Sequence, residues 1–92
     1  MIYKVIVLDE AKQDIALLKK SEIGAYNKVM VFLEELQEHP HAGTGKPEML
    51  KYGKLKGLWS RRITRKHRLV YAIKDNEIIV LVLSVSSHYG DK

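Results

Sequence analysis

The 92-residue sequence contains no cysteine, and this absence excludes both a disulfide framework and a thiolate zinc site. It has only two prolines, with 46% apolar and 29% charged residues, which is the composition of a globular protein. No segment approaches the roughly 18 consecutive apolar residues of a membrane span, and no apolar run follows a basic start. We therefore expect residues 1–92 to form one soluble cytoplasmic domain, without a cofactor and without membrane contact.

Acidic residues are scarce in one long part of the chain. Glu48 is the only acidic residue between Glu38 and Asp75, whereas residues 46–68 contain nine lysines and arginines. All four arginines lie in that part, and the formal net charge of the sequence is +5. One interpretation is a solvated basic surface. The other is a binding site for a polyanion such as RNA, with one carboxylate that can accept a proton.

Hydrophobic periodicity predicts two helices after an initial strand. Residues 2–8 are a β-branched run typical of a strand, and Asp9 could cap the helix that follows. Ser21 could cap a second helix, which should end at His39-Pro40 because a residue before proline avoids the α region. The predicted buried faces consist of Ala11, Ile15 and Leu18 in the first helix, and of Ile23, Tyr26, Met30, Leu33 and Leu36 in the second.

Strand patterns fill the second half of the sequence. Residues 40–57 contain four of the six glycines and both prolines, so they predict a long loop. Residues 58–64, 68–73 and 78–86 then read as three strands, with residues 74–77 as a tight turn. The expected fold class is α+β in the order β-α-α-β-β-β, with a twisted antiparallel sheet and both helices packed on one face. The other face would be open to a ligand.

Two short motifs suggest a phosphate-binding loop and a metal site, but neither site is predicted. Residues 43–46, Gly-Thr-Gly-Lys, are superficially similar to a phosphate loop, but the Walker spacing is missing and Pro47 removes a backbone donor. His39 and His41 lie on either side of Pro40 without a third ligand, so no metal site is predicted.

The arginines of the first predicted hairpin must come close together. If its loop has an odd number of residues, Arg62 shares a face with Arg68, and an even loop puts Arg61 there instead. Like charges directly opposite each other on neighbouring strands are destabilising. A bound anion or carboxylate would relieve this repulsion, since a guanidinium donates bidentately to phosphate oxygens.

A carboxylate, a histidine and arginines are together sufficient to cleave RNA without a metal. A base removes the proton of the ribose 2′-hydroxyl, arginines stabilise the added negative charge on phosphorus, and an acid protonates the departing 5′-oxygen. Glu48, Arg68 and His88 provide these three kinds of group. Alone, His88 would be read as a surface histidine near the end of the chain.

Three segments carry a close resemblance to a known family: GTGKPEMLK, GLWSRRITRKHRLVYAI and the SHY near the end. They resemble the YoeB (Txe) toxins of the RelE/ParE toxin superfamily, densely over about residues 41–74 and only as a pattern over the N-terminal helices. The resemblance implies a metal-independent endoribonuclease of a type II toxin–antitoxin system. Such an enzyme cuts mRNA in the ribosomal A site, giving a 2′,3′-cyclic phosphate and a 5′-hydroxyl, and so inhibits translation.

The resemblance also implies roles for individual residues. Glu48 matches the general base, Arg68 the arginine that stabilises the transition state, and His88 the general acid. Tyr89 matches the residue that helps orient the nucleotide, and Arg62 matches a further phosphate-contacting arginine. The residues that we expect to bind RNA around this set are Lys46, Lys51, Arg61, Arg65 and Trp59. For Trp59, a position in the core is the commoner alternative.

The partners implied are mRNA, 16S rRNA and a cognate YefM-like antitoxin, and a homodimer is left open. Two departures from the family pattern are the tail Gly90-Asp91-Lys92 and the basic pair Arg65-Lys66, where close relatives are acidic. The alternative functions are a non-catalytic ParE-like toxin that poisons DNA gyrase, and a basic RNA-binding module without toxicity.

One geometric difficulty affects the proposed site. With a two-residue turn at Asp75-Asn76, alternation would put Arg68 and His88 on opposite faces of the sheet. We therefore expect an odd-length turn, or a β-bulge near residues 84–87, that restores a shared face.

Overall fold

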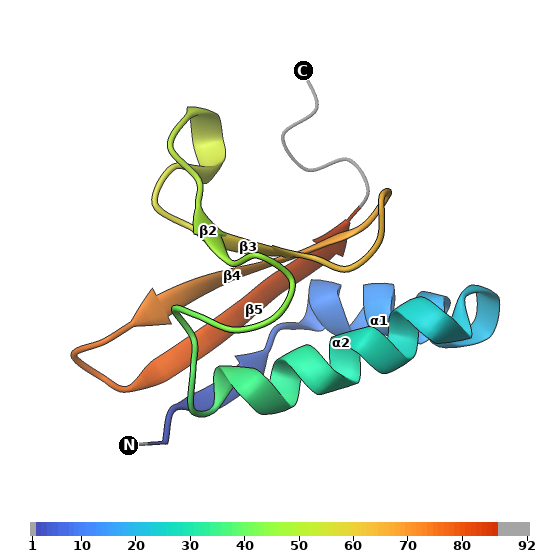
Figure 1. Cartoon of the computed structure of the whole chain (residues 1–92), viewed down its shortest axis with the longest axis horizontal. Helices are drawn as coiled ribbons and strands as arrows, with labels where there is room; N and C mark the ends of the chain where they lie inside the picture. The colour runs from blue at the N-terminus through green and yellow to red at the C-terminus, as the bar shows by residue number, and fades with distance from the viewer. Residues whose placement is uncertain (1, 87–92) are drawn as a thin grey trace.

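The computed structural model describes residues 2–86, which form a five-stranded sheet with two α-helices and one short 3₁₀ turn. The elements are β1 (Lys4–Val7), α1 (Asp9–Ser21), α2 (Ile23–Leu36), β2 (Glu48–Met49), η1 (Gly53–Leu55), β3 (Trp59–Arg62), β4 (Arg68–Lys74) and β5 (Ile79–Ser86). The predicted order β-α-α-β-β-β is confirmed for the two helices and for β1, β3, β4 and β5. The additional strand β2 and the turn η1 lie within the segment expected to be a loop. The fold class is α+β, as predicted (Figure 1).

The strand order across the sheet is β1-β5-β4-β3-β2. Strands β2 to β5 pair antiparallel, but β1 pairs with β5 in parallel, so the sheet is mixed rather than wholly antiparallel. Two neighbouring parallel strands require a long connection between them. Here that connection contains both helices and the other three strands, so the first and last strands of the described chain lie side by side.

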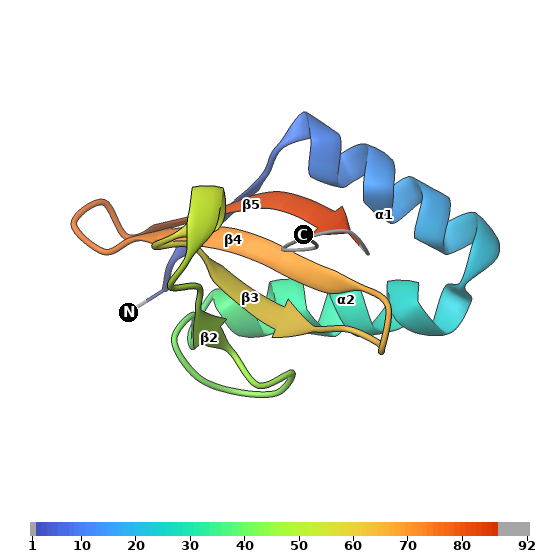
Figure 2. The same ribbon diagram turned by 90° about the horizontal axis from the view of Figure 1, so that it is seen from above.

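Both helices cover one face of the sheet, α1 toward β5 and α2 toward β3 (Figures 1 and 2). Neither helix, within the described residues 2–86, is long and apolar enough to cross a membrane. The buried residues of the two helices are Ala11, Leu18, Ala25, Val29, Phe32 and Leu36. In α1 the predicted face is confirmed, whereas in α2 the buried stripe is centred one residue away from the predicted one. Tyr26, Met30 and Leu33 therefore flank the core, and Ile23 is exposed.

The two predicted helix caps are wrong. Leu8 is the N-cap of α1, so Asp9 lies inside the first turn. There its negative charge interacts favourably with the positive end of the helix dipole. Ser21 is the last residue of α1, and its hydroxyl donates to the carbonyl oxygen of Leu17 at 2.9 Å. Glu22 is the junction between the helices, so the second helix starts two residues after Ser21. The α2 helix ends at Leu36, before His39-Pro40.

Candidate functional site

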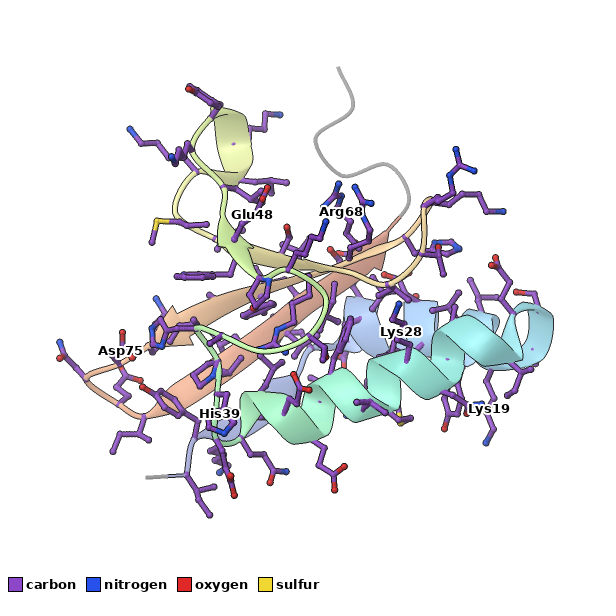
Figure 3. All side chains as sticks on the ribbon, viewed as in Figure 1. Lys19, Lys28, His39, Glu48, Arg68 and Asp75 are labelled. Carbon is purple, nitrogen blue, oxygen red and sulfur yellow. The ribbon has the colours of Figure 1, made fainter. Side chains whose placement is uncertain are left out.

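The sheet face away from the helices carries three of the predicted catalytic residues. Glu48 of β2 pairs with Ser60 of β3, and Arg62 of β3 pairs with Arg68 of β4. Paired residues share a face, and alternation along β3 puts Ser60 and Arg62 on the same one. Figure 3 shows Glu48 and Arg68 on the side opposite to α1 and α2. This face, called the open face below, includes Glu48, Ser60, Arg62, Arg68, Val70 and Ser84, of which Ser60 and Val70 are buried.

The hairpin between β3 and β4 brings two arginines directly opposite each other. The amide of Ile63 donates to the carbonyl of His67 at 3.0 Å, which leaves the three residues 64–66 at the tip. This is the odd-length loop, so Arg62 rather than Arg61 faces Arg68. Side chains at such paired positions have Cβ atoms about 4.5–5.5 Å apart. Arg62 is exposed and Arg68 half-buried, so the pair presents two guanidiniums at the surface of the open face.

Glu48 lies diagonally across from this arginine pair. It is exposed on the edge strand β2, one strand away from Arg62 and two residues along. Such diagonal neighbours have Cα atoms about 7–8 Å apart, within reach of long side chains. A carboxylate at this position can accept a proton from a ligand whose phosphate contacts the two arginines. The open face thus combines one carboxylate with two guanidiniums.

A β-bulge changes the register of the last hairpin. Lys74 pairs with Ile79 across a four-residue turn, an even length that would place Arg68 opposite Val85. The register shifts between Val70 and Tyr71, however, and Leu83 is the extra residue on β5. Arg68 therefore pairs with Ser86. The bulge expected near residues 84–87 is therefore present, at the adjacent Leu83. His88 and Tyr89 lie outside the described residues.

Arg61 faces the helices and does not fit the predicted RNA contact, because its side chain is completely buried. Its guanidinium donates to a Glu35 carboxylate oxygen at 2.6 Å and to the Tyr71 hydroxyl at 3.1 Å. It also donates to three backbone carbonyls, those of His39 (2.6 Å), Ala42 (2.7 Å) and Thr44 (3.4 Å). These contacts satisfy a charge that would otherwise be very costly to bury. Arg61 therefore stabilises the loop that leads to Glu48.

Glu35 is the second anchor of this loop, and the sequence offered no signal for it. One of its carboxylate oxygens accepts from the amide of Thr44 at 3.1 Å, and the other accepts from the Thr44 hydroxyl at 2.9 Å. Burial alone would raise the pKa of Glu35, but the hydrogen bonds from Thr44 and Arg61 outweigh it and lower that pKa. Burial raises the pKa of the Tyr71 hydroxyl, which bridges Arg61 and the carbonyl of Pro40.

Gly45 lets the same loop pass close to the core. Its φ angle of 80° is in the left-handed region, and an added Cβ would lie 2.6 Å from Cζ of Phe32. Its carbonyl accepts from the amide of Arg62 at 2.7 Å. The backbone just before β2 is therefore tied to β3, which fixes where Glu48 enters the open face.

The other predicted RNA contacts divide between two environments. Lys46, Lys51 and Arg65 are exposed, on the loop before β2, the segment after it and the tip of the β3–β4 hairpin. Trp59 instead shares the helix-side face with Tyr71 and packs partly buried against the core. Its ring meets that of His41 edge-on, with centroids 5.4 Å apart. The core alternative for Trp59 is therefore the better one.

Two histidines form contacts that the sequence did not predict. Nε2 of His67 lies 3.0 Å from a carboxylate oxygen of Glu22, which links the β3–β4 tip to the junction of the two helices. This hydrogen bond lowers the pKa of Glu22. Nε2 of His41 lies 3.4 Å from Asp75, which also accepts from the hydroxyl of Tyr3 at 2.6 Å. Both pairs join segments more than 30 residues apart in the sequence.

The sequence is similar to those of known proteins. Residues 8–89 match the family described as YoeB-like toxin of bacterial type II toxin–antitoxin system. The chain is 36% identical to Toxin YoeB of Escherichia coli K12 over 77 residues, 84% of this chain and 90% of that protein. It is 42% identical to Toxin YoeB of Synechocystis over 62 residues, 67% of this chain and 69% of that protein.

Solved structures give the same result. A YoeB/ParE toxin from Agrobacterium tumefaciens superposes with a TM-score of 0.82 at 30% identity, over 94% of this chain and 99% of that one. The toxin of a YoeB–YefM complex from Staphylococcus aureus superposes with a TM-score of 0.77 at 28% identity, over 97% of this chain and all of that one.

The fold and the sequence matches define a small α+β toxin of a type II toxin–antitoxin system. Within this class, the chain belongs to the family of YoeB-like toxins.

Proposed function

We propose that this toxin is a ribosome-dependent mRNA endoribonuclease that cuts mRNA in the A site without a metal. The observation that carries the proposal is the placement of Glu48, Arg62 and Arg68 together on the open face. Cleavage of RNA by its own 2′-hydroxyl needs a base and cations at the phosphate, and these three residues provide both. An anion bound beside the like-charged pair Arg62–Arg68 would relieve the repulsion between the two residues.

In the proposed reaction, Glu48 takes the proton of the ribose 2′-hydroxyl, and the 2′-oxygen attacks the neighbouring phosphorus. Arg62 and Arg68 stabilise the negative charge that builds up on the phosphate oxygens. The bond to the 5′-oxygen breaks, and His88 supplies the proton that this oxygen takes. The products are a 2′,3′-cyclic phosphate and a 5′-hydroxyl. Tyr89 would orient the nucleotide.

The roles of His88 and Tyr89 rest on the family resemblance together with the register of β5. The bulge at Leu83 brings Ser86, two residues before His88 in the sequence, opposite Arg68. Without this shift, Val85 would occupy that position. In the described part of β5 the register is therefore shifted by one residue, which is the shift that the proposed role of His88 as the acid requires.

The proposed partners are the ribosome, with its mRNA and 16S rRNA, and an antitoxin. A YoeB from Staphylococcus aureus has been solved both as a YoeB–YefM complex and as a dimer. We propose by analogy that this chain binds a YefM-like antitoxin and can form a homodimer.

The decisive experiment is mapping of mRNA 5′ ends in a reconstituted translation reaction containing the purified toxin. We expect Glu48→Gln, which keeps the shape and removes the base, to lower the single-turnover cleavage rate about 10²- to 10⁴-fold. Arg68→Ala and His88→Ala should fall in the same range. Glu34→Gln, at an exposed position of α2, is the matched control and should cut at the parental rate.

Two results would overturn the proposal. One is cleavage by Glu48→Gln and His88→Ala at the parental rate. The other is a parent protein that produces no new mRNA ends but causes gyrase-linked DNA breaks, which would indicate a ParE-like toxin instead.

A further inference from the structure

Residues 50–58, between β2 and β3, form a projecting segment that we call the basic finger. It begins two residues after Glu48 and rises on the side of the sheet away from the helices (Figure 1). It contains Lys51, Lys54 and Lys56, all exposed, and no acidic residue. Figure 3 shows Glu48 at its base.

Hydrogen bonds between its two ends give the basic finger a defined shape. The amide of Leu50 donates to the carbonyl of Leu58 at 2.7 Å, and that of Gly57 donates back to Leu50 at 2.8 Å. The 3₁₀ turn η1 occupies its tip, and the amide of Lys56 donates to the carbonyl of Gly53 at 3.2 Å. Gly53 and Gly57 have φ angles of 73° and 91°, which permit these sharp turns.

Tyr52 is the notable side chain of the basic finger. It is 86% exposed, more than any other exposed large hydrophobic residue among those described, of which Ile2 comes next at 66%. A single exposed apolar residue is ordinary. An exposed aromatic ring on an ordered loop, with Lys51 before it, Lys54 two residues after it and the proposed base Glu48 nearby, is a less ordinary combination.

This combination fits single-stranded RNA better than a protein surface. Every nucleobase has a flat face that can stack on an aromatic ring, and lysines neutralise the phosphates between successive bases. The Cα atoms of Tyr52 and Glu48 are at most about 14 Å apart along four extended residues, which is the rise of about four stacked nucleotides. One short RNA strand can therefore contact both.

We propose that the basic finger binds single-stranded RNA beside the scissile bond, with the Tyr52 ring stacked on a base and Lys51, Lys54 and Lys56 at the phosphates. This inference rests on the proposed function, because it gives the open face a second contact for the same strand. Stacking of this kind tolerates any base, so the basic finger adds affinity and register without demanding a sequence.

The test measures binding of a fluorescent single-stranded RNA of about ten nucleotides without ribosomes, using the full chain with Glu48→Gln to prevent cutting. Tyr52→Ala should bind about 5- to 100-fold more weakly, and Tyr52→Phe, which keeps the ring, should bind as the parent does. Because the side chain is exposed, both variants should keep the parental unfolding temperature. Equal affinity of Tyr52→Ala and the parent would overturn the stacking contact.

A matched pair of triple variants separates local contacts from net charge. Changing Lys51, Lys54 and Lys56 to alanine removes the cations of the basic finger, and changing Lys12, Lys19 and Lys28 to alanine removes three exposed cations from the helices. The first change should reduce the slope of log affinity against log salt by about 2, at about 0.7 per lost phosphate contact. The change in the helices should leave most of the salt dependence of binding in place. Equal losses in both would show that the basic finger has no special role.

Failure of this inference can be told apart from failure of the proposed function. If the parent cuts mRNA in a Glu48-dependent way while Tyr52→Ala binds RNA normally, only the role of the basic finger is wrong. If the finger variants lose RNA affinity but the parent cuts no mRNA, only the nuclease assignment is wrong. If Tyr52→Ala loses antitoxin binding and keeps RNA binding, the finger is a protein contact and the inference falls.

Discussion

Arg61 and Arg62 are adjacent in the sequence but lie on opposite faces of β3. Arg62 is exposed on the open face, opposite another arginine. Arg61 is fully buried and donates to a carboxylate, a hydroxyl and three backbone carbonyls. Strand alternation thus divides one basic run into an exposed arginine and a buried, structural one. A cation in a basic segment therefore cannot be assigned to RNA from its charge alone.

The largest expected effect concerns stability at these two arginines. Arg61→Ala removes a hydrogen-bond donor from Glu35, from Tyr71 and from three backbone carbonyls, so it should lower the free energy of unfolding by about 3–5 kcal/mol. Arg62→Ala should change it by about 0.5 kcal/mol or less, because the residue is exposed and removal of one like charge relieves repulsion. Urea unfolding followed by circular dichroism measures both. Equal effects would mean that the contrast between the two arginines is wrong.

Glycines with positive φ provide a second contrast between the buried side and the basic finger. Gly45→Ala and Gly53→Ala both carry the left-handed strain of a non-glycine residue, about 1 kcal/mol. At Gly45 the new methyl group also meets Phe32 at 2.6 Å, which should bring the total to about 2–4 kcal/mol. At Gly53 nothing lies within 4 Å, so only the strain remains. Unfolding curves of the two variants should rank them in this order, and the reverse order would refute the packing argument.

The hydroxyl of Tyr71 gives a finer test of the Arg61 contacts. Tyr71→Phe removes an acceptor of Arg61 and a donor to the carbonyl of Pro40, and should lower the free energy of unfolding by about 1–3 kcal/mol. Tyr52→Phe is the matched control, since its hydroxyl is exposed, and should leave stability unchanged within about 0.5 kcal/mol. Unfolding by urea compares them directly. A Tyr71→Phe variant as stable as the control would contradict the bridging role.

The smallest expected effect is on the pH dependence of stability. The pKa of Glu35 is lower in the folded state than in the unfolded chain, so its contribution is complete above the ordinary pKa of 4.5 and is lost as the pH falls through the lowered value. Glu35→Gln should therefore flatten the decline in unfolding free energy between pH 6 and pH 3. Glu34→Gln, at an exposed neighbouring position, should keep the parental slope. Parallel curves for Glu35→Gln and the parent would exclude this linkage.

The sequence predicted the helices, the three long strands and one open face, because periodicity records which side of an element is buried. It could not decide between Arg61 and Arg62, since the face depends on whether one loop has an odd or an even length. It also missed Glu35, because the partner of a buried charge can lie anywhere in the chain and here lies 26 residues from Arg61. Parallel pairing of β1 had no local signal for the same reason.

The sequence predicted some features of the site better than others. The structure brings Glu48, Arg62 and Arg68 to one face. The turn after β4 has an even length, so a bulge is needed for the shared face, and it occurs at Leu83, next to the residues near which it was expected. A bulge is set by the packing of both strands, so a sequence pattern alone can require one without locating it.

The pairing of β1 with β5 has a consequence for the timing of folding. Lys4 and Ile79 are partners although the chain between them includes every other strand and both helices. A growing chain that ends before residue 79 therefore has no partner strand for its first one, and α1 lacks the amide of Val85 that donates to Asp14 at 3.0 Å. Contacts this distant in sequence slow folding. Synthesis should thus yield a folded toxin only when nearly the whole chain has emerged, so a prematurely released fragment lacks an intact sheet.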